Sequence, residues 1–324
     1  MTRVRVGEVE LEVEEIGDGP PLVLIMGIGA QLIHWPDALC EDLAGRGFRV
    51  IRFDNRDIGL STKLEHAGVP DIPKALVRAF VGLSVETPYT IRHMADDVAG
   101  LLDALDLEDA HVVGCSMGGM IAQTLAIEHP TRVRSLTSIM STPGGRRHMG
   151  KAKAIRVLLG GPVRSAGEAE ERALRVMRVI GSTGFAMDEE RVRALARRAY
   201  ERSYHPPGFA RQFGAILAAG NRLSTLPSVR APTLVIHGSE DPLIPPKAGR
   251  ATAALVPGAR LRMIEGMGHD LPAALWKTFA DEIAGHARTS EGPRTAGGHV
   301  PQRGAGDVRA GDVLRPGDPV RAVG

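Results

Sequence analysis

Apolar and polar positions along the chain follow two spacings, one typical of strands and the other of helices. Near the N-terminus, every second residue is apolar in VRVGEVELEVEE, which predicts a hairpin. Four later runs are almost continuously apolar, as buried strands are: PPLVLIMG, FRVIRFD, DAHVVGCS and VRSLTSIMS. Helical spacing appears between them, in WPDALCEDLAGRG, TIRHMADDVAGLLDALDL and MGGMIAQTLAIEHP. Strands that alternate with helices in this way predict an α/β protein with a doubly wound, mostly parallel sheet.

The alternation fails over residues 143–226, where the sequence is helical and rich in Arg and Ala, and resumes with TLVIHGSEDPLIPP. Ligands bind at the carboxyl edge of such a sheet, so we predict that residues 143–226 form a helical lid over that edge. The core is then formed by residues 1–142 and 227–288. Residues 289–324 are rich in Gly, Pro and Arg and lack apolar periodicity, which predicts a disordered C-terminal tail.

Composition and charge narrow the function classes. With 324 residues, of which 43% are apolar, the chain can fill a sizeable core. The net charge is only +2 and basic residues are mixed with acidic ones, so we expect no nucleic-acid partner. We also expect no membrane insertion and no signal peptide, because no apolar run approaches the roughly 20 residues of a span. The only cysteines, Cys40 and Cys115, suggest reduced thiols and a cytoplasmic location.

Candidate chemistry begins at HVVGCSMGGM, where a predicted strand ends among small residues. Gly114, Ser116 and Gly118 fit the G-x-S-x-G nucleophile elbow, in which a serine stands on a sharp strand-to-helix turn. The chain passes so close to itself at such a turn that larger side chains would collide, which accounts for the glycines. We therefore predict that Ser116 is a nucleophile. The alternative, judged from this motif alone, is a Gly-rich turn with an incidental serine.

A serine hydroxyl is a poor nucleophile at neutral pH, so a base and an orienting acid must reach the same edge of the sheet. In chains with this elbow the acid follows the serine, and the histidine follows the acid. TLVIHGSEDPLIP places Asp241 at the end of a predicted strand, with Glu240 as the alternative acid. LRMIEGMGHD places His269 after the next strand, and elimination favours it, because His286 lies in a helical pattern and His299 in the tail.

Two backbone N–H groups should stabilise the oxyanion that forms during attack on a carbonyl. Met117 supplies one donor because it directly follows the serine. The loop after an early strand, IMGIGAQLIHW, should supply the second, and we assign the N–H of Ile28, between Gly27 and Gly29. The alternative is that these glycines serve only a tight turn. No cofactor and no metal site is predicted.

Taken together, GCSMGG, HGSEDPLIP and GMGHD resemble the α/β-hydrolase superfamily, from the N-terminal hairpin to about Arg288. The resemblance implies the α/β-hydrolase fold. The chain departs from the pattern at Met26, where many members have a histidine that supports the oxyanion loop. The stretch from MGIGAQ to DIGLST is similar to a bacterial group that includes the methylesterases of aromatic polyketide (anthracycline) biosynthesis. Within it, we interpret Asp54 and Arg56 as parts of a structural turn.

These observations predict a serine esterase that cleaves a hydrophobic carboxylic ester of small-molecule size, such as a methyl ester of a bulky aromatic acid, through Ser116, Asp241 and His269. A carbon–carbon bond hydrolase and a cofactor-free perhydrolase would use the same residues and stay open as alternatives. A receptor of the same fold without catalysis is a further alternative, and turnover of an ester distinguishes it. The sequence predicts no particular oligomeric state.

Overall fold

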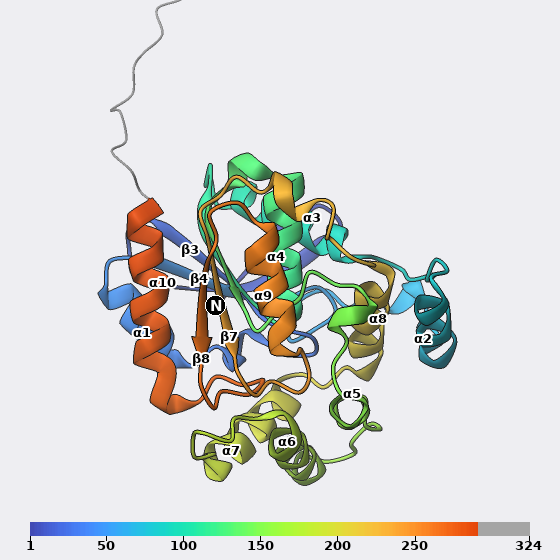
Figure 1. Cartoon of the computed structure of the whole chain (residues 1–324). Coiled ribbons are helices and arrows are strands. Elements are labelled where there is room, and N and C mark those ends of the chain that lie inside the picture. The colour runs from blue at the N-terminus through green and yellow to red at the C-terminus, as the bar shows by residue number, and fades with distance from the viewer. Residues whose placement is uncertain (291–324) are drawn as a thin grey trace, which may run out of the picture. The chain divides into compact units, whose positions relative to one another are not determined.

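The computed structural model describes residues 1–290, which are built around one sheet of eight strands (Figure 1). The strands are β1 (Thr2–Val6), β2 (Val9–Ile16), β3 (Pro21–Ile25), β4 (Arg49–Phe53), β5 (Ala110–Cys115), β6 (Val133–Ile139), β7 (Thr233–Gly238) and β8 (Arg260–Ile264). Their order across the sheet is β1-β2-β4-β3-β5-β6-β7-β8. The pairs β1–β2 and β2–β4 are antiparallel, and the remaining pairs are parallel. The predicted mostly parallel, doubly wound sheet is confirmed.

The strand register brings the loops that carry the candidate chemistry to one edge. Ile25 of β3 lies opposite Gly114 of β5, and Cys115 lies opposite Ile139 of β6. β7 and β8 also end side by side, with Gly238 opposite the last residue of β8. The segments after β3, β5, β7 and β8 therefore leave the sheet at its carboxyl edge, where ligands bind in folds of this kind.

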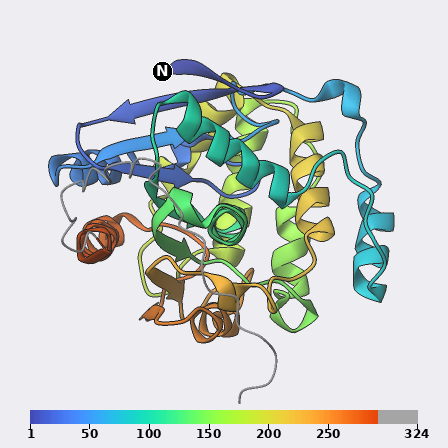
Figure 2. The ribbon, with the colours of Figure 1, turned by 90° about the horizontal axis from the view of Figure 1, so that it is seen from above.

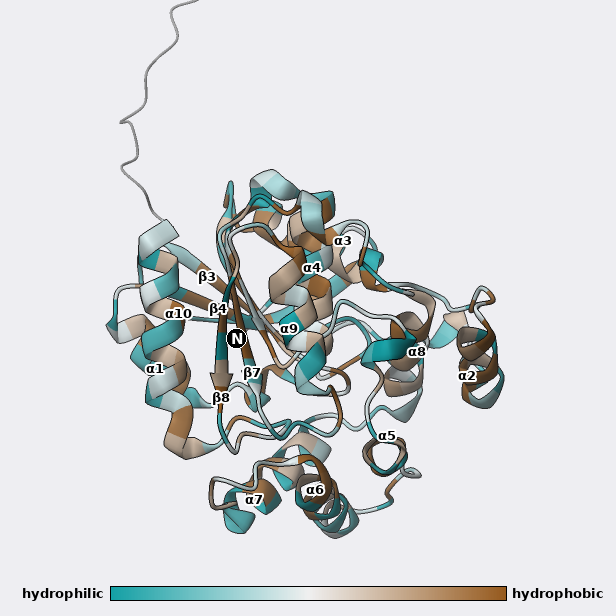
Figure 3. Ribbon diagram, viewed as in Figure 1, coloured by the Kyte–Doolittle hydropathy of each residue, from teal (hydrophilic) through white to brown (hydrophobic). Residues whose placement is uncertain are grey.

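Helices cover both faces of the sheet and bury an apolar core against each (Figures 1 and 2). One face packs against α1 (Asp37–Gly45) and α10 (Trp276–Ser290), and the other against α3 (Ile91–Ala104), α4 (Met117–Glu128) and α9 (Pro246–Leu255). Much of the central strands is brown in Figure 3, because many of their side chains are apolar, and nearly all of them are buried. Residues 117–126 of α4 are all buried, as expected for a helix that is apolar on every side.

The segment predicted as a helical insert contains α5 (Ala152–Leu158), α6 (Ala166–Ile180), α7 (Glu189–Arg202) and α8 (Pro206–Ala218). α6 and α7 lie beyond the carboxyl ends of β7 and β8 (Figure 1). A bridge between Gly144 and Asn221 joins the beginning of this segment to its end. We use the word lid for residues 143–226, and their covering role stays a prediction.

The remaining helices connect these layers. α2 (Ile72–Val81) was not predicted from the apolar pattern, and it exposes Val77, Phe80 and Val81. Short 3₁₀ helices complete the described chain: η1 (Leu32–His34), η2 (Glu65–Ala67), η3 (Pro130–Arg132), η4 (Arg146–His148), η5 (Leu226–Ser228) and η6 (Ala273–Leu275).

The C-terminal boundary differs slightly from the prediction. α10 continues to Ser290, so residues 289 and 290 are helical, although they were assigned to the disordered tail. The last turn stays packed because Ala287 is buried in the core, and Thr289 Oγ1 and Ser290 Oγ donate to the carbonyl of His286 at 2.9 and 2.8 Å. The rest of the predicted tail, residues 291–324, lies outside the described residues.

Other sequence expectations concern the surroundings of the core. Cys40 and Cys115 are both free and buried. None of the helices within residues 1–290 combines the length and the apolar character that crossing a bilayer requires. The cytoplasmic location stays a prediction.

Candidate active site

Ser116 stands on a sharp turn between β5 and α4. Its backbone has φ 57° and ψ −118°, a region that side-chain-bearing residues rarely occupy and that marks local strain. Two hydrogen bonds hold the turn: Ser116 N donates to Ile139 O at 2.9 Å, and Ser141 Oγ donates to Ser116 O at 2.8 Å. The strain is therefore maintained by the neighbouring strand β6 and the loop that follows it.

The glycines around Ser116 are required by close backbone contacts. A Cβ on Gly114 would overlap the carbonyl of Gly118 across the turn. A Cβ on Gly118 would overlap the carbonyl of Ile25 at the end of β3. The crowding expected for a nucleophile elbow is thus present on both sides of the serine.

His269 connects Ser116 to Asp241. His269 Nε2 lies 3.0 Å from Ser116 Oγ, and His269 Nδ1 lies 2.7 Å from Asp241 Oδ2. An ionised carboxylate only accepts hydrogen bonds, so Nδ1 carries the proton and Nε2 is left to accept from the serine hydroxyl. All three side chains are buried. The arrangement can withdraw a proton from Ser116 as its oxygen attacks an electrophile.

Asp241, and not Glu240, is the acid that reaches His269. Asp241 Oδ1 accepts from the N–H groups of Leu243 and Ile244 at 2.9 and 2.8 Å, which leaves Oδ2 for the imidazole. Glu240 is exposed on the same turn. The three hydrogen bonds fix the carboxylate in place.

His237 of β7 is a neighbour of this acid that was not predicted from the sequence. Its Nε2 lies 2.8 Å from Ile244 O and 3.7 Å from Asp241 Oδ2. Burial lowers the pKa of His237, so the ring is neutral and donates to the carbonyl. His237 therefore supports the turn that carries Asp241.

The loop that carries His269 is tied to the lid. His269 N donates to Ile180 O at 2.7 Å, and Gly268 N donates to Ser182 Oγ at 2.9 Å. Ser182 Oγ in turn donates to Asp270 Oδ1 at 2.6 Å. Burial raises the pKa of Asp270, although the hydrogen bonds that its carboxylate accepts from Ser182 oppose this shift. The end of α6 thus fixes the loop on which the imidazole stands.

The predicted oxyanion donors lie next to the serine. A Cβ on Gly27 would be 3.1 Å from Ser116 Cβ, so the loop after β3 packs directly against the elbow. Met117 begins α4, whose N-terminal N–H groups are free of helical partners. Within residues 1–290, neither Ile28 N–H nor Met117 N–H donates to a protein acceptor. Both are therefore available to a ligand atom.

Two polar side chains hold the loop after β3, in which Met26 stands where a histidine was expected from the family resemblance. Asn55 Nδ2 donates to the carbonyl of Met26 at 3.1 Å. Gln212 of α8 accepts from Gly29 N–H at 2.9 Å through Oε1. Neither side chain belongs to a motif that could be predicted from the sequence.

A cavity of about 790 Å³ opens beside Ser116 and His269, and most of its lining is apolar. The chain has only 7 Phe and 3 Tyr, yet four of them line this cavity: Tyr200, Tyr204, Phe209 and Phe213. Of the charged residues at the wall, Arg172 donates to the carbonyls of Leu158 and Gly161. Arg191 lies over the ring of Trp276, and its buried Nε has no hydrogen-bond partner. The cavity thus suits a bulky apolar molecule. Among the described residues, no group of three His, Cys, Asp or Glu is placed to hold a metal ion.

Comparison with known proteins gives matches over most of the chain. The family model described as alpha/beta hydrolase fold matches residues 20–272. The rhodomycin D methylesterase DauP of Streptomyces sp. (strain C5) is 31% identical over an alignment of 307 positions that covers 87% of this chain and 96% of that protein. The rhodomycin D methylesterase DnrP of Streptomyces peucetius is 30% identical with the same coverage.

Solved structures agree at the level of the fold. A meta-cleavage product hydrolase from Pseudomonas fluorescens IP01 superposes with a TM-score of 0.70 at 22% identity, covering 90% of this chain and 98% of that one. An esterase from Exiguobacterium antarcticum also gives a TM-score of 0.70, at 19% identity, with 89% and 99% covered.

Proposed function

Because the chain belongs to the alpha/beta hydrolase fold family, we propose that it is a serine hydrolase that cleaves a carboxylic ester without a cofactor. The hydrogen-bonded series from Ser116 through His269 to Asp241 is the observation that carries the proposal. Ile28 and Met117 supply the N–H groups of the oxyanion hole. The curated relatives support ester hydrolysis, because two of them are methylesterases.

The first half of the reaction makes an acyl-enzyme. Ser116 Oγ attacks the ester carbonyl carbon while its proton moves to His269 Nε2, which lies 3.0 Å away. The carbonyl oxygen becomes an oxyanion and accepts from the N–H groups of Ile28 and Met117. Asp241 stabilises the imidazolium that forms. The bond to the alkoxy oxygen then breaks, and the departing alcohol takes the proton from His269.

The second half releases the acid. Water enters the position of the alcohol, gives its proton to His269 Nε2 and attacks the acyl carbon. A second oxyanion forms in the same hole and collapses, and the bond to Ser116 Oγ breaks. The proton returns from His269 to the serine oxygen, so the enzyme is unchanged at the end of the cycle.

For the substrate, we propose an uncharged ester of a bulky hydrophobic acid, with a small alcohol such as methanol. The apolar cavity of about 790 Å³ supports this size, since pockets for drug-sized ligands span about 300–1,000 Å³. Tyr200 and Tyr204 at its wall have ring centres 5.0 Å apart, and such rings favour flat aromatic groups. The methylesterase relatives support a methyl ester.

The alternative reactions gain no comparable support. The likeness to the meta-cleavage product hydrolase, at 22% identity, concerns the fold and not the reaction. A receptor without catalysis would need neither the strained serine nor the histidine that contacts it.

The proposal is tested with a panel of esters that share one alcohol and differ in the acid. We expect the methyl ester of a polycyclic aromatic acid to give a higher kcat/KM than methyl butyrate. Ser116→Ala should remain folded, bind the bulky ester and leave it intact. Binding of the ester to the unsubstituted protein without turnover would instead favour the receptor, and no turnover of any ester would contradict the proposal.

A further inference from the structure

Two lid helices hold the loop that carries Ile28. Gln212 of α8 is fully buried and bridges two backbone groups. Its Oε1 accepts from Gly29 N–H at 2.9 Å, and its Nε2 donates to Arg56 O at 3.0 Å. The peptide group that follows Ile28 is therefore fixed by a side chain of the lid, more than 180 residues away in sequence.

A second link joins the same loop to the end of α7. Gln31 Nε2 donates to the carbonyls of Ala199 and Ser203, at 2.7 and 2.8 Å. Ala199 O also accepts from Ser203 N–H at 3.1 Å, so Gln31 adds a second hydrogen bond at the helix end and binds the carbonyl of Ser203 just beyond it. The oxyanion loop therefore caps α7 from outside.

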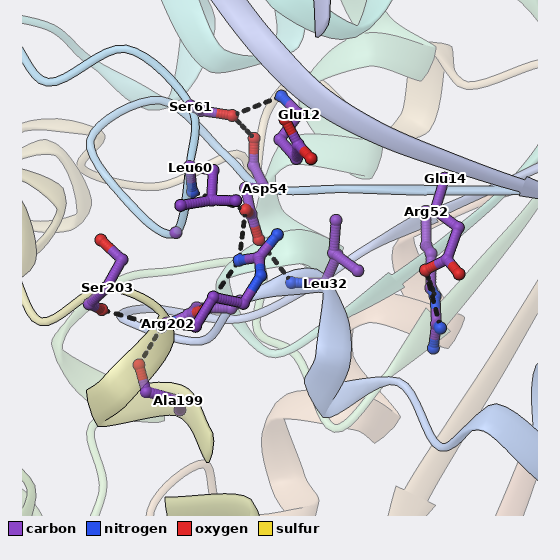
Figure 4. Close-up of polar contacts among 12 residues, drawn as sticks. Glu12, Glu14, Leu32, Arg52, Asp54, Leu60, Ser61, Ala199, Arg202 and Ser203 are labelled. Carbon is purple, nitrogen blue, oxygen red and sulfur yellow. Dashed lines mark hydrogen bonds and ion pairs between the residues drawn. The ribbon is translucent and has the colours of Figure 1, made fainter. Parts of the chain in front are cut away.

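A buried ion pair between Arg202 and Asp54 also connects the end of α7 to the core (Figure 4). Arg202, the last residue of α7, directs Nη1 to Gln31 Oε1 and to Asp54 Oδ2, at 2.7 Å in each case. Asp54 is fully buried and also accepts from the N–H groups of Leu32 and Leu60, at 2.7 and 2.8 Å. Removing α7 would leave the carboxylate of Asp54 without its cation, which is costly for a buried charge.

We propose that Gln31, Arg202 and Gln212 are positioning residues, and that docking of α7 and α8 onto the core and alignment of Ile28 N–H are one event. This inference rests on the proposed function, in which Ile28 N–H stabilises the oxyanion. The segment between β3 and η1 includes two glycines and Met26 in place of a histidine, so its own sequence gives it little stiffness. The lid supplies the missing restraint.

The catalytic consequence follows from the geometry that an oxyanion hole requires. A donor displaced by about 1 Å can cost about 10²-fold in rate. Substrate binding depends mainly on the apolar cavity, whose lining includes Gln31 but neither Arg202 nor Gln212. Replacing Gln212 alone leaves the lining residues of α7 and α8 in the wall, so it should lower kcat and leave KM nearly unchanged.

The first test compares Gln212→Met with Arg198→Met. Gln212→Met removes the acceptor of Gly29 N–H at similar volume. Arg198 precedes Arg202 by one turn of α7 and makes only an exposed contact of 3.7 Å with Asp37, so it is the matched control. We expect kcat to fall at least about tenfold in Gln212→Met, with KM changed less than about threefold, and both constants to be unchanged in Arg198→Met.

The inhibition constant of a compound that forms a tetrahedral adduct measures stabilisation of the oxyanion. A merely structural role of Gln212 would leave that constant unchanged. An aryl trifluoromethyl ketone adds to a nucleophilic serine and places its oxyanion in the hole. In Gln212→Met its inhibition constant should rise by the same factor as kcat falls. An unchanged constant, or a raised KM at unchanged kcat, would overturn the inference.

Hydrogen exchange tests the link without relying on activity. The peptide spanning residues 26–34 should exchange faster in Gln212→Met and in Arg202→Met, and at the wild-type rate in Arg198→Met. Arg202→Lys, which keeps a cationic donor for Asp54, should recover part of the protection, and Arg202→Met decides the matter if Gln212→Met does not fold. Equal exchange in all variants would overturn the inference. A wild-type protein that hydrolyses no ester would contradict the proposed function alone.

Discussion

Replacing Asp241 with asparagine should stop ester hydrolysis while leaving the fold in place. Asparagine keeps an oxygen for the N–H groups of Leu243 and Ile244, which Asp241 Oδ1 now accepts. Its amide nitrogen then faces His269 Nδ1, where the carboxylate oxygen lies at 2.7 Å. An amide N–H there forces Nδ1 to accept and moves the imidazole proton to Nε2. That nitrogen then points a proton at Ser116 and no longer accepts one.

The magnitude follows from what this exchange removes. The histidine must react through a disfavoured tautomer, and the imidazolium loses its buried counter-charge. In the serine protease triad the same exchange lowers kcat by about 10⁴. At about 1.36 kcal/mol for each factor of ten, this is about 5.4 kcal/mol of transition-state stabilisation. We expect a similar loss here, because Asp241 is buried and its contact with His269 is short.

The assay is kcat/KM on an activated ester, measured on folded protein verified by circular dichroism and thermal melting. Glu240→Gln is the matched control, since Glu240 is the adjacent carboxylate and is exposed. It should retain nearly full activity. Asp241→Asn with activity within about tenfold of wild type, or a larger loss in Glu240→Gln, would refute the assignment of the acid.

Three further predictions concern packing, the cavity and the thiols. Gly118→Ala should lower the melting temperature and the activity, because the added Cβ would overlap a carbonyl of β3 and such overpacking costs about 1–3 kcal/mol. The control is Gly285→Ala in α10, where the added Cβ would meet nothing within 4 Å, so its melting temperature should not fall. Ala173→Phe should reduce kcat/KM for bulky esters and spare the smallest, since Ala173 lines the cavity; a uniform loss over the ester panel would contradict a selective lid. Burial raises the pKa of Cys40 to about 12 and also raises that of Cys115, so both thiols stay neutral, and neither should react with a thiol reagent until the protein unfolds; rapid native labelling would contradict this.

The sequence predicted the parts of the site that are encoded locally. Ser116, Asp241 and His269 each follow a short apolar run, and parallel strands bring such positions to one edge of the sheet. The structure places the three side chains within hydrogen-bonding distance, while their catalytic roles stay a prediction. The reason for the glycines of the elbow could also be predicted, because backbone crowding at a strand-to-helix turn leaves no room for larger residues.

The links between the lid and the core could not be predicted in this way. Gln212 lies in an apolar stretch of α8 and has no motif around it, and its partner Gly29 is remote in sequence. Arg202 resembles the many other arginines of the lid, which are mostly exposed. Pairing a side chain with a distant backbone group leaves no periodicity in the sequence, so only the folded chain identifies it.

The most direct test of the mechanism is the covalent labelling of the nucleophile. A fluorophosphonate reacts with a serine activated by a histidine and leaves a stable adduct, which peptide mass spectrometry can locate. We expect a single adduct, on Ser116, formed at a rate that falls strongly in His269→Ala, because the imidazole Nε2 lies 3.0 Å from the serine oxygen. An adduct on another residue, or an unmodified Ser116 in protein that still hydrolyses esters, would contradict the assignment of Ser116 as the nucleophile.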